Sequence, residues 1–530
     1  MLITVIRASL IAVAGLSPVL AADSVLSASR PTRSGAVGGL PAWQRAALKA
    51  PEVVEKQVLL PDTRPPELEA ARGAENAAGL DKVGYVEDVD ASLLPSWDWS
   101  PRADGSAAAR VRFASRGACG LRLRIADIDP KSQIEMRFYD GSGESVLGPF
   151  RAPRVDEKGG WWSPTIWGEV AGVELVALDG VREDAAQPRV SQVAYLNQAG
   201  SCGVTPGATL PCNNDIRCHS TWANGEGRAV ALFYNIKEGV CLRWTGALLN
   251  RQPNDLSPLF MTSNFACGTS GEADSVEVYW EYESASCGGV FPATPANQPR
   301  NLGAVRIKRH LDADWSLLAL LDPPAASNPD YLGWNSGSWS DNATATVIHH
   351  PRGSFKRISF GETGILQQVA LCLSILPGGC FDVDSRRVIT DDGPTELGST
   401  GAPVVDSNRQ VRLVISGRLS DSWVCADAPF RSYGGRFDQA YEHLKYALAD
   451  AYIASPTYVN NTAVGDDGGN GILERGVASA PFTGILEASF VVRAGDELRI
   501  NPGDYTGRVK IWRPMKLKRD GTTGSVRMGV

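Results

Sequence analysis

Residues 393–403, which read GPTELGSTGAP, place a hydroxyl side chain between glycines. Such a tight turn would expose the hydroxyl of Thr400 as a nucleophile. The backbone N–H groups of Gly398, Ser399 and Thr400 could form an oxyanion hole, which stabilises the negative charge of an acyl-transfer transition state. Acyl transfer also needs an imidazole base beside the hydroxyl and a carboxylate that orients the imidazole. The sequence therefore raises the question whether this site is complete.

The composition is that of an acidic, exported, globular protein. The chain has 530 residues, 43% hydrophobic and 21% charged, which is enough for two to four domains. Its net charge of −7 argues against nucleic acid as the main partner. Residues 1–22 predict a secretory signal peptide, cleaved after Ala21 or Ala22, because their apolar run is short and interrupted by Pro18. We therefore expect a secreted or periplasmic protein without a membrane span after signal removal.

The cysteine count bears on compartment and on metal binding. Ten cysteines in an exported chain predict disulfides, and their spacing alone leaves the connectivity open. There is no CxxC pair and the five histidines are scattered, so we expect no metal site and no cofactor. A calcium loop within residues 465–471 is disfavoured, because Val477 stands where a closing Glu is needed.

Hydrophobic periodicity predicts an all-β protein with one prominent helix. Alternating apolar and polar residues after position 108 predict a β-sandwich. Short apolar runs then recur, and apolar residues three and four apart between Phe437 and Ala451 predict a closing helix. Before the sandwich, only residues 57–61 and 84–86 could be short strands, and residues 490–500 predict a hairpin near the C-terminus.

These patterns divide the chain into six segments. They are a signal peptide (1–22), a leader or linker (23–107), a sandwich (108–205), a double β-barrel (206–455), a Gly- and Asp-rich linker (456–471), and a small β-module with a basic tail (472–530). We expect the tail's basic residues to lie on a solvated face.

The central block resembles the bacterial lysyl endopeptidases, which are secreted serine proteases of the trypsin fold. The matching stretches cover a little under half of the chain and follow the family's order. The resemblance implies a trypsin-like double β-barrel for residues 206–455, and the preceding sandwich resembles the pro-region of such enzymes. The stretches are residues 211–218, Cys241 with 245–250, 278–287, 313–318, 348–359 and 395–403.

The resemblance implies Asp314 as the triad carboxylate and Thr400 at the nucleophile position. In the family a histidine immediately precedes the cysteine that corresponds to Cys267. Here that position holds Phe265 or Ala266, and neither can accept a proton. Threonine nucleophiles are generally activated by another base, such as an N-terminal amine, and Thr400 is internal. A relocated base would have to be one of His219, His310, His349, His350 and His443.

Substrate recognition differs from the family's pattern as well. The family has an aspartate shortly before a Tyr-Gly-Arg segment, and this acid is missing before Tyr433. The wall of the binding cleft corresponds to Ser416, Gly417 and Arg418. An arginine there would repel a lysine side chain rather than bind it.

The resemblance also implies disulfides and a maturation state. Self-cleavage after lysine would need a basic residue just before Cys212, and residues 190–211 contain neither Lys nor Arg. We therefore expect the sandwich to stay attached. The implied pairs are Cys212–Cys425, Cys218–Cys287 and Cys241–Cys267, which leave Cys119–Cys202 and Cys372–Cys380.

Two functions remain open at this point. The chain could be a pseudoprotease that acts in binding or extracellular assembly, with an unknown protein or cell-envelope partner. Alternatively, it could be an active serine/threonine-type endopeptidase that uses Thr400 and Asp314 with a relocated base.

Overall fold

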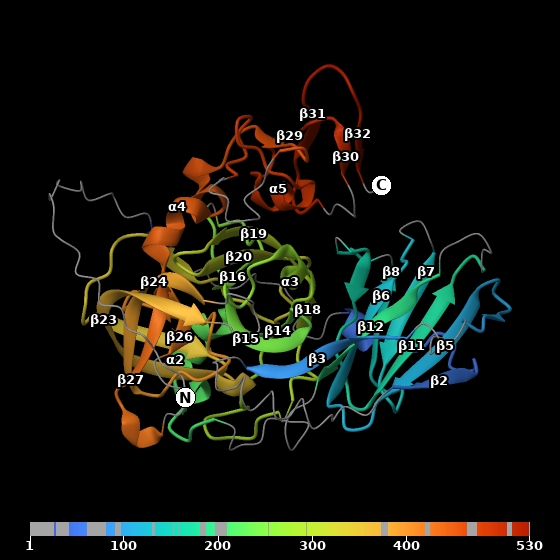
Figure 1. Cartoon of the computed structure of the whole chain (residues 1–530), viewed down its shortest axis with the longest axis horizontal. Helices are drawn as coiled ribbons and strands as arrows, with labels where there is room; N and C mark the ends of the chain where they lie inside the picture. Colours follow the sequence, from blue (N-terminus) through green and yellow to red (C-terminus); the bar gives the residue numbers. More distant parts are fainter. Residues whose placement is uncertain are drawn as a thin grey trace.

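The computed structural model of the chain has three parts that follow one another along the sequence (Figure 1). An N-terminal sandwich lies beside two central barrels, and a C-terminal module packs against the barrels. The predicted signal peptide and half of the predicted Gly- and Asp-rich linker, residues 464–471, lie outside the described residues. The structure describes residues 26–27, 42–60, 81–90, 97–129, 133–151, 153–156, 158–180, 187–196, 209–252, 254–292, 294–372, 380–418, 424–463, 474–505 and 511–528.

The first central barrel is an antiparallel sheet that turns back on itself. Its two outer strands are successive pieces of chain, separated only by Gly303 at φ +69°. Large apolar side chains such as Trp244 and Phe260 fill its interior. In order of pairing, the strands are β18 (Arg300–Leu302), β17 (Glu277–Tyr279), β14 (Val230–Lys237), β15 (Val240–Leu248), β16 (Leu259–Ser263), β20 (Trp315–Leu320) and β19 (Ala304–His310).

The second barrel is a closed ring of strands. Each strand pairs antiparallel with the next, and the last returns to the first. Around the ring the strands are β22 (Thr344–His349), β23 (Arg357–Cys372), β24 (Cys380–Asp392), β27 (Phe430–Arg436), β26 (Gln410–Arg418) and β25 (Pro403–Val405). The all-β fold with a trypsin-like double barrel is therefore confirmed.

A single long helix follows the second barrel, as the periodicity predicted. Helix α4 (Phe437–Leu448) buries the apolar stripe read from the sequence, and Phe437 packs against Trp315 of the first barrel. The helix therefore ties the two barrels together.

The N-terminal sandwich has two facing sheets around a core that includes Phe113, Leu123 and Phe138. One sheet contains β2 (Glu55–Leu59), β4 (Ser100–Pro101), β5 (Ala107–Ala114), β11 (Val170–Ala177), β7 (Ile134–Tyr139) and β8 (Val146–Arg151). The other contains β9 (Gly160–Trp162), β10 (Ile166–Trp167), β6 (Gly120–Ala126), β12 (Arg189–Leu196) and β3 (Lys82–Asp88).

The segment expected to be a leader contributes strands to this sandwich. The possible strand at 57–61 overlaps the end of β2, and the one at 84–86 lies within β3. Both strands pair with neighbours far along the chain, which local periodicity cannot reveal. Strand β3 pairs with β12 on one side and with β15 on the other, so the sandwich and the first barrel share one continuous sheet (Figure 1).

The C-terminal module combines one short helix with small parallel sheets. Strands β28 (Thr457–Val459), β29 (Glu497–Ile500) and β31 (Lys516–Arg519) form one sheet, and β30 (Gly503–Tyr505) pairs with β32 (Val526–Met528). The predicted hairpin over 490–500 is wrong. Helix α5 (Ile485–Val491) occupies its first part, because an apolar helix face that includes Phe490 joins the core of the first barrel.

The basic tail is only partly solvated. Arg513 is buried, where its guanidinium binds Asp255, the Ser257 hydroxyl and the Phe490 carbonyl. The expectation of a solvated face is therefore wrong for this residue, because it anchors the module to the first barrel. Within the described ranges, no helix is long and apolar enough to cross a membrane.

Candidate active site

Residues 393–403, called the glycine loop from here on, lie where the two barrels meet. The Thr400 carbonyl accepts a hydrogen bond from the Thr245 N–H of β15 (3.0 Å), and the Gly401 N–H donates to Ile415 O of β26 (2.7 Å). Gly401 has φ +90°, and a Cβ there would lie 2.1 Å from Thr245 O and 2.2 Å from Thr262 Oγ1. Only glycine therefore allows the loop to approach the first barrel this closely.

The loop's backbone donors fall into two groups. The Ser399 N–H donates to Glu396 O (3.0 Å) within the loop. The N–H groups of Gly398 and Thr400, by contrast, have no acceptor among the described residues, and Gly398 has φ +82°. Two of the three N–H groups considered from the sequence therefore remain unpaired in the described structure.

A buried hydrogen bond between Ser399 and His349 holds the loop in place. His349 Nδ1 lies 2.7 Å from Ser399 Oγ, and its Nε2 lies 3.0 Å from Ser359 Oγ. Burial, with a smaller effect of the Arg357 charge, lowers the pKa of His349 to about 3. The imidazole is therefore neutral, and both of its nitrogens are engaged. It holds the loop through a serine that is itself 1% exposed.

Asp314 lies in the turn between β19 and β20, in the left-handed region at φ +53°. Its carbonyl accepts the Asn264 N–H (3.1 Å), and Oδ1 accepts the Phe265 N–H (2.7 Å). Oδ2 has no hydrogen-bond partner among the described residues. Burial raises the pKa of Asp314 to about 7, although the nearby Ser416 hydroxyl and the Phe265 N–H favour the charged form. The carboxyl therefore binds a proton far more readily than an exposed carboxyl does.

The two residues that could stand at the histidine position are both packed inward. The Phe265 ring lies edge-on against Trp244 inside the first barrel, with centroids 5.8 Å apart. Ala266 is fully buried, and its N–H donates to Ser263 Oγ (2.9 Å). Neither position offers a titratable side chain to the carboxyl of Asp314.

All five histidines lie in the described part of the chain, and none forms a hydrogen bond with Thr400. His349 is engaged by two serines, and His350 Nδ1 lies 2.9 Å from Ser354 O. The rings of His310 and His443 pack against each other at a tilt of 49°, with centroids 4.5 Å apart, and His219 packs on Phe360. The Thr400 hydroxyl has no hydrogen-bond partner among the described residues either, and Thr400 is 7% exposed.

The predicted cleft wall follows β26. Ser416 Oγ accepts the Gly435 N–H (3.1 Å), and Gly435 O accepts the indole N–H of Trp315 (3.0 Å). A Cβ on Gly435 would lie only 2.0 Å from Ala313 O, beside Asp314. Gly417 and Arg418 continue the strand opposite β27. The turn that carries Asp314 is therefore held between the two barrels.

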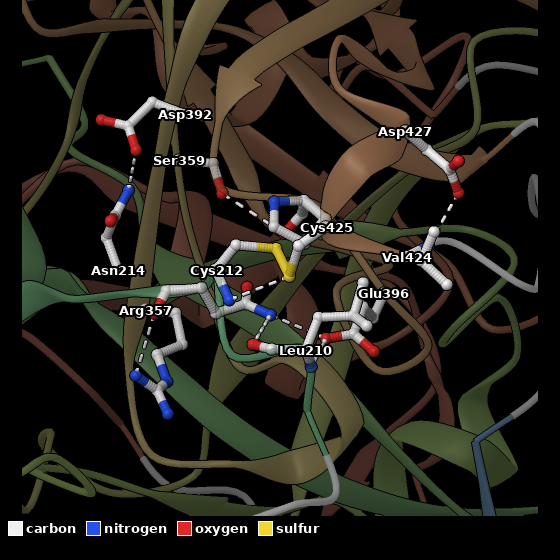
Figure 2. Close-up of a disulfide and its surroundings, with 12 residues drawn as sticks. Leu210, Cys212, Asn214, Arg357, Ser359, Asp392, Glu396, Val424, Cys425 and Asp427 are labelled. Carbon is white, nitrogen blue, oxygen red and sulfur yellow. Dashed lines mark hydrogen bonds between the residues drawn. A yellow bond between two sulfur atoms is a disulfide. The ribbon is translucent and has the colours of Figure 1, made fainter.

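Two of the predicted disulfides are present, Cys212–Cys425 and Cys218–Cys287. Figure 2 shows the first of them close to Glu396 of the glycine loop. Glu396 Oε1 accepts the Leu210 N–H (2.9 Å) and the Asn213 side-chain N–H (2.7 Å). The loop therefore binds the chain segment that leads into the central block.

The predicted Cys241–Cys267 bridge is wrong, since both are buried free thiols. Neighbouring side chains of a strand point to opposite faces. Leu242 of β15 points into the first barrel with Cys267, whereas Cys241 belongs to the cluster on the other side of the sheet. Trp244, rather than a cysteine, fills the space beside Phe265.

The remaining two pairs stay predictions. Cys372 and Cys380 are register partners of β23 and β24, but their side chains lie outside the described ones. Cys119 takes part in a disulfide, and its predicted partner Cys202 lies outside the described residues.

No metal site accompanies the loop. Among the described residues, no three His, Cys, Asp or Glu side chains gather closely enough to hold a metal ion.

One contact of the loop could not be expected from the sequence. Asp81, from the predicted leader, places a carboxylate oxygen 2.9 Å from where a Cβ of Gly398 would be. The Asp81 carboxylate pairs with the guanidinium of Arg243 of β15, whose Nε lies 2.5 Å from Asp81 Oδ2. No spacing or motif connects residues that are so far apart along the chain.

Two adjoining β-barrels, a closing helix and a glycine loop between them define a protein of the trypsin fold. The model of the lysyl endopeptidase C-terminal domain matches residues 206–430, and that of the lysyl endopeptidase N-terminal domain matches residues 52–197. The chain is thus lysyl endopeptidase-like in both its sandwich and its barrels. The second match begins within the predicted leader, in agreement with the place of β2 and β3 in the sandwich.

Known proteins support the same assignment. Lysyl endopeptidase from Pseudomonas aeruginosa is 26% identical over 290 residues, which are 51% of this chain and 61% of that protein. The match therefore spans less than two thirds of that relative.

Similar solved structures include the active form of the Rv3671c protease from M. tuberculosis, with a TM-score of 0.32 and 16% identity over 46% of this chain and 91% of that one. The HtrA-type protease AlgW with a tripeptide gives a TM-score of 0.30 and 14% identity over 44% of this chain and 64% of that one. Because these TM-scores are low, the fold assignment rests on the strand pairing.

Proposed function

We propose that the chain is an exported pseudoprotease, a trypsin-fold protein that acts by binding or assembly rather than by peptide hydrolysis. The observation that carries the proposal is that none of the five histidines, all in the described part of the chain, forms a hydrogen bond with Thr400. A hydroxyl is a weak nucleophile near neutral pH unless a base takes its proton. Without that base, the loop presents only an alcohol.

The carboxyl and the hydrophobic packing support the same conclusion. A triad carboxylate must be charged to stabilise an imidazolium, whereas burial raises the pKa of Asp314 to about 7. Phe265 packs into the core of the first barrel, so the position that holds the histidine in the family contributes to hydrophobic packing here. Loss of triad members costs roughly a millionfold in kcat in comparable enzymes.

One observation favours the alternative of an active threonine-type endopeptidase. The N–H groups of Gly398 and Thr400 are unpaired among the described residues, as an oxyanion hole requires. Oxyanion stabilisation and binding alone leave only about 10³–10⁴-fold acceleration over water. An active threonine-type endopeptidase would therefore still need a base for Thr400 that the groups described above do not supply.

The test is activity profiling of the purified exported protein with a broad peptide library and a hydroxyl-directed phosphonate probe. We expect no turnover and no labelling above the level of Thr400→Ala, while an active lysyl endopeptidase in parallel reacts with both. Turnover or labelling by the unmodified chain that Thr400→Ala abolishes would overturn the pseudoprotease proposal. A partner would be sought among exported proteins and cell-envelope components.

A further inference from the structure

Strand β3 occupies the edge of β15 that leads to the glycine loop. The pairing is antiparallel, with Val240 opposite Tyr85, Cys241 opposite Gly84 and Leu242 opposite Lys82. Backbone bonds extend it at both ends, from the Val86 N–H to Gly239 O and from the Arg243 N–H to Asp81 O. An extended peptide adds to an open sheet edge through this kind of pairing. On β15 the edge is already filled by the chain itself.

The filled edge ends directly beside the loop. Two residues beyond Arg243, Thr245 donates its N–H to Thr400 O (3.0 Å) and its hydroxyl to Gly398 O (2.9 Å). The Asp81 carboxylate lies beside Gly398, with Oδ2 2.9 Å from where a Cβ of Gly398 would be. A peptide that approached Thr400 along β15 would therefore meet β3 and Asp81 first.

A buried ion pair holds the end of β3 in place. Arg243 Nε lies 2.5 Å from Asp81 Oδ2 and Nη2 lies 3.1 Å from Oδ1, so the guanidinium grips the carboxylate with two nitrogens. Both side chains are less than a tenth exposed. Removing one partner of a buried pair leaves an uncompensated charge, which is strongly unfavourable. The pair therefore locks β3 onto β15.

A second buried group fixes the sandwich that carries β3. Arg122 of β6 donates to Ser275 O (2.8 Å) and lies 3.8 Å from Glu277 of β17. Glu277 also accepts the N–H and hydroxyl of Thr165 and pairs with Arg300 (2.9 Å). These contacts join the sandwich to the first barrel through side chains that water hardly reaches. The sandwich therefore cannot slide along the barrel without breaking them.

We propose that β3 is a built-in strand ligand of β15. It fills the place of an extended peptide beside Gly398, so this edge of β15 can pair with a peptide of another chain only where β3 is displaced. The occupied edge of β15 does not depend on whether the chain hydrolyses peptides.

Hydrogen exchange of the full-length exported chain tests the lock. In Asp81→Asn, exchange of the Arg243 amide should become at least about tenfold faster, because Arg243 loses its charged partner in a buried place. The matched control is Asp88→Asn, which makes the same change at an exposed carboxylate at the far end of β3. It should leave exchange at Arg243 unchanged. Equal exchange at Arg243 in all three proteins would overturn the proposal.

Peptide binding tests the occupied edge directly. The probe is a fluorescein-labelled peptide of residues 81–90 (DKVGYVEDVD), measured by anisotropy with the full-length chain. The unmodified chain should not bind it. Gly84→Ala should bind it, because the new Cβ would lie 1.9 Å from Tyr195 O of β12, so β3 could not keep its place between β12 and β15. Equal binding by both proteins, or none by a folded Gly84→Ala, would contradict the proposal. If Gly84→Ala does not fold, the exchange at Asp81→Asn decides.

Discussion

At the scale of single residues, the candidate site combines retained and altered chemistry. Gly398 and Gly401 keep a turn that only glycine can form at this distance from β15. Asp314 is held by backbone N–H groups, but burial makes it easier to protonate than an exposed carboxyl. Such a group stabilises the fold as a neutral acid and destabilises it as a carboxylate.

This property of Asp314 predicts a pH dependence of stability. Its pKa is about 7 when folded and ~3.9 when unfolded. The folded state thus binds more protons between these values, so the contribution is fully present below about pH 4 and is lost as pH rises through 7. Asp314→Asn mimics the protonated acid, so its free energy of unfolding should not show this decrease with rising pH. Relative to the unmodified chain, it should gain up to about 4 kcal/mol between pH 4 and pH 8.

Urea denaturation from pH 4.5 to pH 8 measures the effect. Asp314→Ala is the control, since it also removes the titrating group but leaves the Phe265 N–H unpaired and places alanine at φ +53°. It should be less stable than Asp314→Asn by about 1–3 kcal/mol at every pH. Parallel stability curves for the unmodified chain and Asp314→Asn would contradict the raised pKa.

At the scale of elements, close approaches between strands and loops position the site. The loop of Gly401 reaches both barrels through hydrogen bonds to Thr245 and Ile415, and His349 of β22 pins it from behind through Ser399. On the other side, Gly435 of β27 lets the second barrel touch the turn of Asp314. The loop and the turn are therefore kept in place by packing that does not depend on catalysis.

Gly401→Ala should disturb this arrangement strongly. The new Cβ would meet Thr245 O and the Thr262 hydroxyl at little more than 2 Å, in a backbone region that disfavours a side chain. We expect a loss of stability of about 3 kcal/mol or more, measured by thermal unfolding. Gly271→Ala in helix α3 (Ser270–Asp274) is the matched control, because no atom lies within 4 Å of its new Cβ. An equal effect of both changes would show that the close approach is unimportant.

At the scale of the whole molecule, the sandwich, the barrels and the C-terminal module form one connected body. The continuous sheet through β3 joins the first two, and Arg122 with Glu277 adds a buried contact. Lys308 of β19 is fully buried beside Glu474 and Glu487 of the C-terminal module. The sandwich is therefore built into the fold, as expected for a segment that remains attached.

The exported protein should accordingly be one chain that begins at Ala22 or Asp23. Residues 190–211 contain neither Lys nor Arg for self-cleavage, and Glu396 holds the Leu210 N–H just before Cys212. Intact-mass analysis of exported protein under non-reducing and reducing conditions checks this. The reducing sample matters, because a disulfide could hold two cleaved pieces together. A mature species that starts near Gly207 would refute the prediction.

The sequence by itself determined the features that depend on local order. Periodicity predicted helix α4 and recurring short strands in the central block, and the motifs between Cys212 and Pro403 identified the family resemblance. The same motifs placed Asp314 and Thr400 and paired Cys212 with Cys425 and Cys218 with Cys287.

Only the tertiary structure decided which distant residues meet. It assigned Cys241 and Cys267 to opposite sides of one sheet, replaced the predicted hairpin by the end of helix α5 and strand β29, and placed Asp81 beside Gly398. Each outcome depends on strand register or on burial against a remote element. A side chain's face follows from its register, and a register shift of one residue reverses it. Such pairings are set by the packing of the whole chain, which local patterns do not contain.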